Sequence, residues 1–229
     1  GTAMQVDGVA QVVIKDGFAG VVATSRAAAR VGVNRMDIVW DEGKLWQQAE
    51  IEDLVAIGDG GGVMVQKEGD APRLLADGAS LSAEYFTPLA AHASLETQAA
   101  LANVVGDKAT VWASTQAQNS TAGDVAEALG FKSEQVEVIP TFLGGGFGRK
   151  SVSQAAREAA ILSQAAGVPV HVGWDRTEEM RSGYFRPPVR NKLYAKLDES
   201  GKITALEHRQ ASGDVLFAFF PGIAASVLG

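Results

Sequence analysis

The strongest chemical signal in the sequence is the glycine-rich segment 140–150, which reads PTFLGGGFGRK between a predicted strand and a predicted helix. Consecutive glycines permit positive φ angles, so successive backbone N–H groups can converge on one anionic or polar ligand. The dipole of the following helix and the charges of Arg149 and Lys150 favour the same kind of ligand. The segment predicts a loop that binds phosphate or another multi-oxo anion, with a tight strand-to-helix turn as the alternative.

Two familiar phosphate-binding loops do not fit this spacing. A nucleotide P-loop requires glycine, lysine and serine or threonine in succession, whereas Arg149 stands between Gly148 and Lys150. The dinucleotide fingerprint G-x-G-x-x-G, started at Gly144, puts its third glycine on Arg149. The loop therefore fits neither of these nucleotide-binding patterns.

Composition excludes several other kinds of site. The chain has 229 residues, a formal net charge of −7 and no cysteine, so thiolate metal sites, iron–sulfur clusters and a cysteine nucleophile are excluded. Its three histidines are far apart and lack zinc-site spacing. The acidic balance argues against nucleic acid as a partner, and no apolar run approaches the ~18 residues of a membrane span. Glu178 and Glu179 are interpreted as a solvated helix start.

The elements that must position the loop alternate between strands and helices. Strands are predicted at 11–14 and 20–23 around the turn Asp16-Gly17, and at 36–40, 79–88, 98–104, 109–114, 135–139, 170–174, 192–197 and 202–210. Helices are predicted from Ser25 as cap to Gly32, at 47–57, at 119–130 with Asn119, Ser120 or Thr121 as cap, and at 153–166 before Gly167. The fold class is therefore α+β, with mixed sheets and packed helices. The glycine run 58–62 marks either a junction or a hairpin loop.

Several motifs in this order resemble one family. They are WASTQ at 112–116, DVA at 124–126, the glycine-rich segment at 140–150, GWDRTEEM at 173–180 and YFRP at 184–187. Together they resemble the molybdopterin-binding subunit of the xanthine dehydrogenase and aldehyde oxidase family, in particular its isoquinoline 1-oxidoreductase beta branch. The resemblance implies a molybdenum hydroxylase, and it runs from about residue 8 to residue 222.

The resemblance implies a molybdenum–pterin cofactor, molybdopterin, and assigns residues to it. In this family the molybdenum ion is held by the pterin dithiolene, no protein cysteine ligates it, and an aldehyde or N-heterocycle is hydroxylated with oxygen from water. Gln116 matches a glutamine whose amide donates to an oxygen ligand of the metal, with a surface loop glutamine as the alternative. The expected cofactor-binding residues are Gln116, Gly144, Gly145, Gly146, Phe147, Gly148 and Arg149.

Alternatives stay open for several of these residues. Phe147 could equally be a core anchor, and Arg149 and Lys150 are either pterin-phosphate contacts or surface charges at a helix start. Phe185 and Arg186 are expected near the substrate, with a structural arginine before a proline-fixed turn as the alternative for Arg186.

Two further positions depart from the pattern of relatives. Ser151 stands where purine-oxidising relatives carry a glutamate, which argues against xanthine as substrate. His92 and Glu96 align loosely with a family His…Met-Glu-Pro segment, but here the methionine and the proline are missing.

The resemblance also sets expectations for the whole protein. The family's general base, a glutamate near the end of a much longer subunit, has no counterpart here, so the chain is expected to be an inactive central fragment of a molybdenum hydroxylase large subunit. Residues 1–78 would be a partial N-terminal α/β region and 79–229 the start of the molybdopterin-binding domain. The partners would be an iron–sulfur electron-transfer subunit or domain and a small-molecule substrate.

The motifs do not specify the substrate or the oligomeric state. They also do not specify the form of the pterin, including a cytosine dinucleotide form, or the compartment, bacterial cytoplasm or periplasm. The alternative function is a non-enzymatic α+β module whose glycine-rich loop binds an anion or a protein partner.

Overall fold

The computed structural model describes residues 2–15, 17–39, 45–58, 62–182, 184–213 and, for the backbone only, 224–228. Contacts divide the chain into two compact units, each made of two segments of sequence. Unit 1 comprises Gly1–Asp41 and His92–Tyr184, and unit 2 comprises Glu42–Ala91 and Phe185–Gly229. The domain limits 1–78 and 79–229 remain a prediction, and most of the glycine run 58–62 lies outside the described residues.

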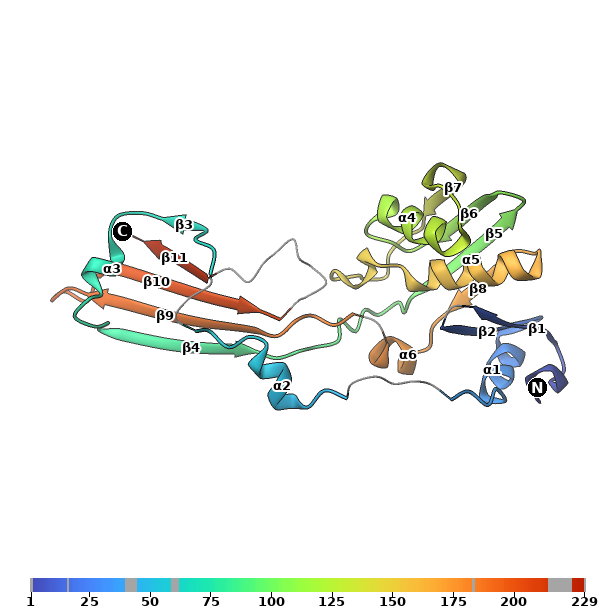
Figure 1. The fold of residues 1–229 in the computed structure, drawn as a ribbon, viewed down its shortest axis with the longest axis horizontal. Coiled ribbons are helices and arrows are strands. Elements are labelled where there is room, and N and C mark those ends of the chain that lie inside the picture. The colour runs from blue at the N-terminus through green and yellow to red at the C-terminus, as the bar shows by residue number, and fades with distance from the viewer. Residues whose placement is uncertain are drawn as a thin grey trace. The chain divides into compact units, whose positions relative to one another are not determined.

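Unit 1 is built on a four-stranded sheet in the order β7-β6-β5-β8, in which β6 and β7 are parallel and the other pairs antiparallel (Figure 1). The strands are β5 (Ala99–Val105), β6 (Lys108–Ala113), β7 (Val136–Pro140) and β8 (Val170–Gly173). The helices α4 (Gln118–Leu129) and α5 (Gln154–Ala166) pack against this sheet. The hairpin β1 (Val9–Lys15) and β2 (Phe18–Ala23), α1 (Arg26–Asn34), α6 (Arg176–Arg181) and the 3-10 turns η1 (Thr2–Gln5), η2 (Ser133–Gln135) and η3 (Arg149–Ser151) complete unit 1.

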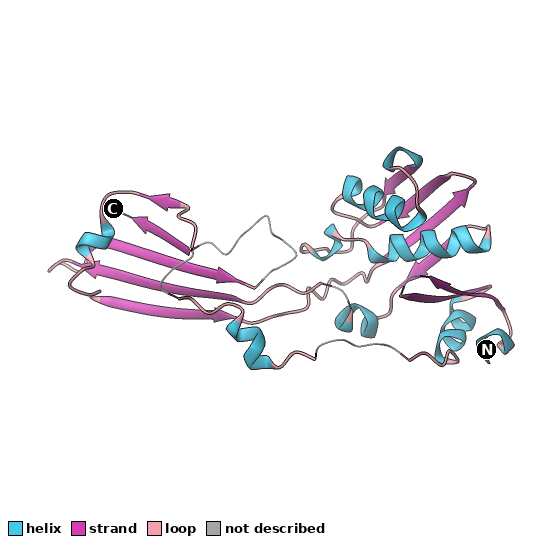
Figure 2. Ribbon diagram, viewed as in Figure 1, coloured by secondary structure: helices cyan, strands magenta, loops and turns pink. Residues whose placement is uncertain are grey.

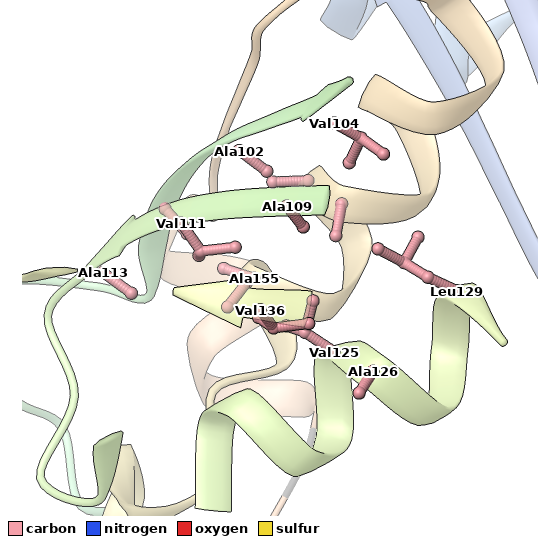
Figure 3. Close-up of a cluster of buried hydrophobic side chains, with 14 of the residues drawn as sticks. Ala102, Val104, Ala109, Val111, Ala113, Val125, Ala126, Leu129, Val136 and Ala155 are labelled. Carbon is pink, nitrogen blue, oxygen red and sulfur yellow. The ribbon is translucent and has the colours of Figure 1, made fainter. Parts of the chain in front are cut away.

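Small side chains form the core of unit 1. Alternate residues of β5 and β6 are buried, as expected for strands with one face against helices. Ala155, Ala156, Ala159 and Ala160 make one face of α5 fully buried, which lets the helix lie close to the sheet. Figure 3 shows Val111 of β6 and Val136 of β7 beside Val125 of α4 and neighbouring alanines in this core.

The predicted helix stops at Gly130 and Gly167 are confirmed, but α1 continues past Gly32 to Asn34 and the helix predicted at 47–57 ends at Asp53. One predicted cap is also wrong. Gly130 and Gly167 both adopt the left-handed conformation that terminates a helix, and Ser25 caps α1 by accepting from the Ala28 amide. Helix α4, however, begins at Gln118 with Ala117 as its N-cap. No side chain caps this helix; the Thr115 hydroxyl accepts from the amide of Ala117 itself, at 3.1 Å.

Unit 2 is a five-stranded sheet in the order β3-β11-β10-β9-β4 (Figure 2). Its strands are β3 (Gln66–Lys67), β4 (Leu81–Thr87), β9 (Val189–Leu197), β10 (Ile203–Ser212) and β11 (Ala224–Leu228), and its helices are α2 (Gln48–Asp53) and α3 (Ala71–Leu74). A small apolar cluster joins α3 to the sheet through Ala71, Leu75 and Ala205. The predicted hairpin of 192–197 and 202–210 is confirmed as the antiparallel pair β9–β10.

One predicted strand is wrong. Residues 36–39 form no strand, and Trp40 lies outside the described residues. Val39 is 95% exposed, Met36 and Ile38 are half-buried, and no strand among the described residues pairs with this run. The α+β fold class, with mixed sheets and packed helices, is confirmed. Among the helices that the structure describes, none has the length and apolar character needed to cross a membrane.

Candidate functional site

Parallel strands bring the two principal candidate segments to the same edge of the sheet. Residues 114–116 follow β6, and the glycine-rich loop 141–148 follows β7, its parallel neighbour. The Thr141 amide donates to the Ala113 carbonyl at 3.0 Å, and the Gln116 amide donates to the Lys150 carbonyl at 2.9 Å. Gln116 and the loop, 25 residues or more apart in sequence, are therefore neighbours in space.

The loop has the backbone geometry of an anion cradle. Gly145, Phe147 and Gly148 have positive φ angles of 94°, 54° and 92°, while Gly146 between them does not. Such alternation turns successive N–H groups toward one side of the chain. Within the described part of the chain, the amides of Gly145, Gly146 and Phe147 meet no acceptor. Of these three residues, Phe147 is exposed, Gly145 is half-buried and Gly146 is buried, and their role in binding a multi-oxo group remains a prediction.

Gln116 fills the space that Gly146 leaves by lacking a side chain. Its Oε1 accepts from the Gly148 amide at 3.0 Å, and a Cβ added at Gly146 would come within 2.4 Å of that same oxygen. The Gln116 residue is exposed, and among the described residues its Nε2 has no acceptor. The amide is thus oriented through its oxygen, with its N–H donors open to a ligand.

Glu96 anchors the start of the loop. Its Oε2 accepts from the Gly144 amide at 2.9 Å and from Lys150 Nζ at 2.5 Å, and its own amide donates to the Gly144 carbonyl at 2.9 Å. Burial alone would raise the pKa of Glu96, but the hydrogen bonds from Lys150 and Gly144 outweigh it and hold the pKa below the usual 4.5. Glu96 is therefore a charged acceptor at ordinary pH.

The segment that carries Glu96 is itself held in place. Arg176 of α6 donates to the carbonyls of Ser94 and Leu95, both at 2.8 Å, and the Thr97 hydroxyl donates to the Trp174 carbonyl at 2.8 Å. These bonds to neighbouring elements fix the carboxylate that receives the loop.

Arg149 and Lys150 are buried, which contradicts the alternative that they are surface charges at a helix start. Arg149 is 2% exposed, and its guanidinium lies 5.4 Å from the Trp174 ring centroid and 3.7 Å from Glu179 Oε1. It also donates to Gln154 Oε1 at 2.6 Å. Burial lowers the pKa of Arg149, with the Glu179 carboxylate opposing that shift.

The same cluster contradicts the interpretation of Glu178 and Glu179 as a solvated helix start. Glu178 completes the capping box of α6 with Asp175, but Glu179 is buried and accepts from the Gln98 amide at 2.9 Å. Beside it, Glu158 accepts from Trp174 Nε1 at 2.8 Å, and burial raises the pKa of Glu158 to about 7. A cluster of buried charged groups thus lies under the loop's C-terminal end.

The loop does not stand directly at a helix N-terminus, as the sequence had suggested. The 3-10 turn η3 follows Gly148, and α5 begins only at Gln154. A helix dipole acts within about one turn, so its contribution at the loop is small. Phe147 is 72% exposed, which contradicts its alternative as a core anchor. The Ser151 amide donates to the Gly148 carbonyl at 3.2 Å, closing η3.

The expected substrate residues belong to unit 2, whereas Gln116 and the loop belong to unit 1. Phe185 is half-buried, and Arg186 is exposed, with a guanidinium donating to the Pro88 carbonyl at 2.9 Å. The backbone of Arg186 also pairs with Ala90. The structural role of Arg186 is thus visible, while the substrate role of both residues remains a prediction.

Glu96 and Lys150 are the site residues that sequence reasoning left outside the cofactor-binding set. The segment 92–97 fits the family pattern only loosely, so the sequence did not reveal that Glu96 pairs with Lys150, 54 positions later. Among the residues that the structure describes, no three histidine or carboxylate side chains lie close enough together to hold a metal ion.

Comparisons with known proteins identify the family. The molybdopterin cofactor-binding domain matches residues 58–215. Curated relatives include the aldehyde oxidoreductase molybdenum-binding subunit PaoC of Escherichia coli, 35% identical over 136 residues that cover 59% of this chain and 19% of PaoC. Another is the isoquinoline 1-oxidoreductase subunit beta of Brevundimonas diminuta, 28% identical over 96% of this chain and 30% of that subunit. The chain thus spans less than a third of either relative's length.

Solved structures agree on the fold. The aldehyde oxidoreductase of Desulfovibrio gigas matches with a TM-score of 0.72 at 19% identity, covering 92% of this chain and 28% of that one. The quinoline 2-oxidoreductase of Pseudomonas putida 86 matches with a TM-score of 0.70 at 22% identity, covering 91% of this chain and 33% of that one. With more than half of its residues matched by the family's own sequence pattern, this chain belongs to the molybdopterin cofactor-binding domain family.

Proposed function

We propose that this chain forms one wall of the cofactor site in a molybdenum hydroxylase that oxidises an aldehyde or an N-heterocycle with oxygen from water. The observation that carries the proposal is the cradle of three free amides, Gly145, Gly146 and Phe147, beside the oriented amide of Gln116. The relatives are named as aldehyde, xanthine and isoquinoline oxidoreductase subunits. Family membership leaves the alternative of a non-enzymatic anion-binding module without support.

The residues present fit a molybdenum–pterin cofactor. Its molybdenum supplies the redox chemistry when the cofactor is bound. Gly144 to Gly148 would approach it through the backbone, and the lack of side chains at Gly144 and Gly146 leaves room for Glu96 and Gln116 beside the loop. Gln116 would donate from Nε2 while Gly148 holds its Oε1. The Arg149 side chain is buried, so it would not contact the cofactor directly but would hold the C-terminal end of the loop in place.

The finer assignments belong to the same proposal. Phe185 and Arg186 would line the approach of the substrate, and Ser151, which lacks a carboxylate, argues against a purine. With no cysteine in the chain, electrons would leave through iron–sulfur clusters carried by another subunit or domain. The pterin could carry a cytosine nucleotide, a form that molybdenum and nucleotide analysis of the purified holoenzyme would identify.

The loop assignment is tested by Gly146→Ala, with Gly123→Ala as the matched control. A methyl group at Gly146 meets Gln116, whereas at Gly123 of α4 it meets open space, and neither glycine has a positive φ. The methyl group would force the Gln116 side chain off the Gly148 amide and into the cradle, whereas Gln116→Ala leaves that space empty. We therefore expect Gly146→Ala to lower the molybdenum and pterin content of the purified holoenzyme at least fivefold while it stays folded. Gly123→Ala should keep both. A Gly146→Ala protein that is fully loaded would refute the cofactor wall.

The role of Gln116 is tested by Gln116→Ala beside Gln118→Ala, an exposed glutamine at the start of α4. A preorganised donor lost from an active site typically costs about 10²–10³-fold in turnover. We expect that loss for Gln116→Ala with cofactor content nearly unchanged, and wild-type turnover for Gln118→Ala. Equal rates for the two variants would contradict the assignment of Gln116.

A further inference from the structure

We propose that the Lys150–Glu96 ion pair is a positioning device that couples Gln116 to the glycine-rich loop, so that both halves of the cradle are set before a ligand arrives. The two residues do not supply the free donors of the cradle. Lys150 instead contacts the segment that carries Gln116, and Glu96 contacts the start of the glycine-rich loop. The inference rests on the proposed function for its purpose, while the coupling itself stands on contacts within unit 1.

Lys150 holds one half through its backbone. Its carbonyl accepts from the Gln116 amide at 2.9 Å and from the Thr115 hydroxyl at 3.2 Å. Thr115 is buried, and its hydroxyl also lies 2.9 Å from that of Thr121 in α4. The segment that presents Gln116 is therefore tied to Lys150 on one side and to α4 on the other.

The Lys150 side chain holds the other half. It is 1% exposed, which makes it a costly place for a charge unless a carboxylate faces it. Glu96 supplies that carboxylate, and the same oxygen accepts from the Gly144 amide at the first turn of the loop. A change at any one of these three groups is therefore felt by the other two.

Glu96 Oε2 accepts from both Lys150 Nζ and the Gly144 amide, which explains why a lysine and a glutamate suit these positions. A neutral residue at 150 would leave Glu96 without its closest donor, and a neutral residue at 96 would leave the Lys150 charge buried alone. The pair costs desolvation, so its retention here fits a geometric role better than a contribution to stability. The geometry it sets is the distance between the Gln116 amide and the start of the loop.

Lys150→Met tests the coupling, with Lys15→Met as the matched control. Lys15 also donates to a backbone carbonyl in unit 1, that of Ala128 at 2.8 Å, but it lies outside the loop's contacts. Amide hydrogen exchange of the full chain is measured by mass spectrometry on peptides covering 114–118, 142–148 and, as an internal reference, β5. We expect Lys150→Met to speed exchange at least tenfold at the hydrogen-bonded amides of the first two segments, which are Gln116 and Ala117 in one and Gly144 and Gly148 in the other, and to leave β5 unchanged. Lys15→Met should leave all three unchanged.

A second variant keeps the test valid if Lys150→Met folds poorly. In Glu96→Gln/Lys150→Met no charge is buried, and the glutamine still accepts from the Gly144 amide, yet the link to residue 150 is lost. We expect this protein to fold, to show faster exchange in 114–118, and to contain at least fivefold less molybdenum and pterin as purified holoenzyme. Wild-type exchange in 114–118 would overturn the coupling.

The outcomes separate this inference from the proposed function. If the double variant keeps full cofactor content while Gly146→Ala loses it, the positioning role is overturned and the cofactor wall stands. If both keep full content, the proposed function itself fails. Loss of cofactor in both, with unchanged exchange in β5, supports the pair as the device that sets the cradle.

Discussion

Two ion pairs, one in each unit, lie in opposite environments. Under the glycine-rich loop of unit 1, Arg149 and Glu179 are both almost completely buried, and each has only a few polar partners. On the sheet of unit 2, Arg190 and Glu84 form a closer pair, at 2.5 Å, but their side chains are 24% and 45% exposed. The two pairs therefore differ in their access to water, and this difference should decide how much each contributes to stability.

Breaking the buried pair should have the largest effect on stability. In Glu179→Gln the side chain can still accept from the Gln98 amide, but the Arg149 charge loses its nearest carboxylate. Removing one member of a buried pair typically costs about 3–5 kcal/mol, because the other charge stays buried alone. We expect a loss of that size in the free energy of unfolding, measured in urea. A loss below about 1 kcal/mol would mean that water already reaches Arg149.

Much of this site could be predicted from the sequence. The family motifs predict that Gln116 and the glycine-rich loop serve one site, and the parallel pairing of β6 and β7, which the motifs do not predict, brings them to one edge. The helix stops at Gly130 and Gly167 follow from the conformational freedom of glycine. Such features are local, or depend only on which strands are neighbours.

The buried charges could not be predicted in the same way. Arg149, Lys150 and Glu179 look like surface residues, since charged side chains are seldom buried without partners. Their partners come from distant segments, as with Glu96, 54 positions before Lys150. Likewise, the run 36–39 has strand-forming residues, but its sequence does not show whether another strand lies beside it to form hydrogen bonds. Tertiary packing decides both cases.

The pH dependence of stability sharpens the comparison. Burial raises the pKa of Glu158 to about 7 from the usual 4.5, so its stabilising contribution is complete below pH 4.5 and is lost as the pH rises through about 7. Glu158→Gln stays neutral and can still accept from Trp174 Nε1. Relative to wild type, the variant should therefore gain up to about 3 kcal/mol between pH 4.5 and pH 8, at about 1.4 kcal/mol per pH unit.

The measurement is urea unfolding of both proteins at several pH values, followed by tryptophan fluorescence. Other titrating groups are common to both proteins, so they cancel in the difference. Parallel stability curves for wild type and Glu158→Gln would contradict the raised pKa and would place Glu158 in contact with water.

The smallest effect is expected on the sheet of unit 2. Glu84→Gln removes the carboxylate that faces Arg190 and Lys192, at 2.5 and 3.9 Å. Exposed pairs contribute about 0–1 kcal/mol, because water solvates either charge once the other is gone. Arg190 also stacks on the Phe86 ring, 5.1 Å from its centroid, and this contact persists in the variant.

We therefore expect Glu84→Gln to lower the free energy of unfolding by less than about 1 kcal/mol, and by still less in 1 M salt, where charges are screened beyond about 3 Å. Salt should leave the loss in Glu179→Gln nearly unchanged, since that pair is closed to ions. Equal losses in the two variants, or equal salt dependence, would show that burial does not distinguish them. The contrast between unit 1 and unit 2 would then have to come from packing around the charges and not from their access to water.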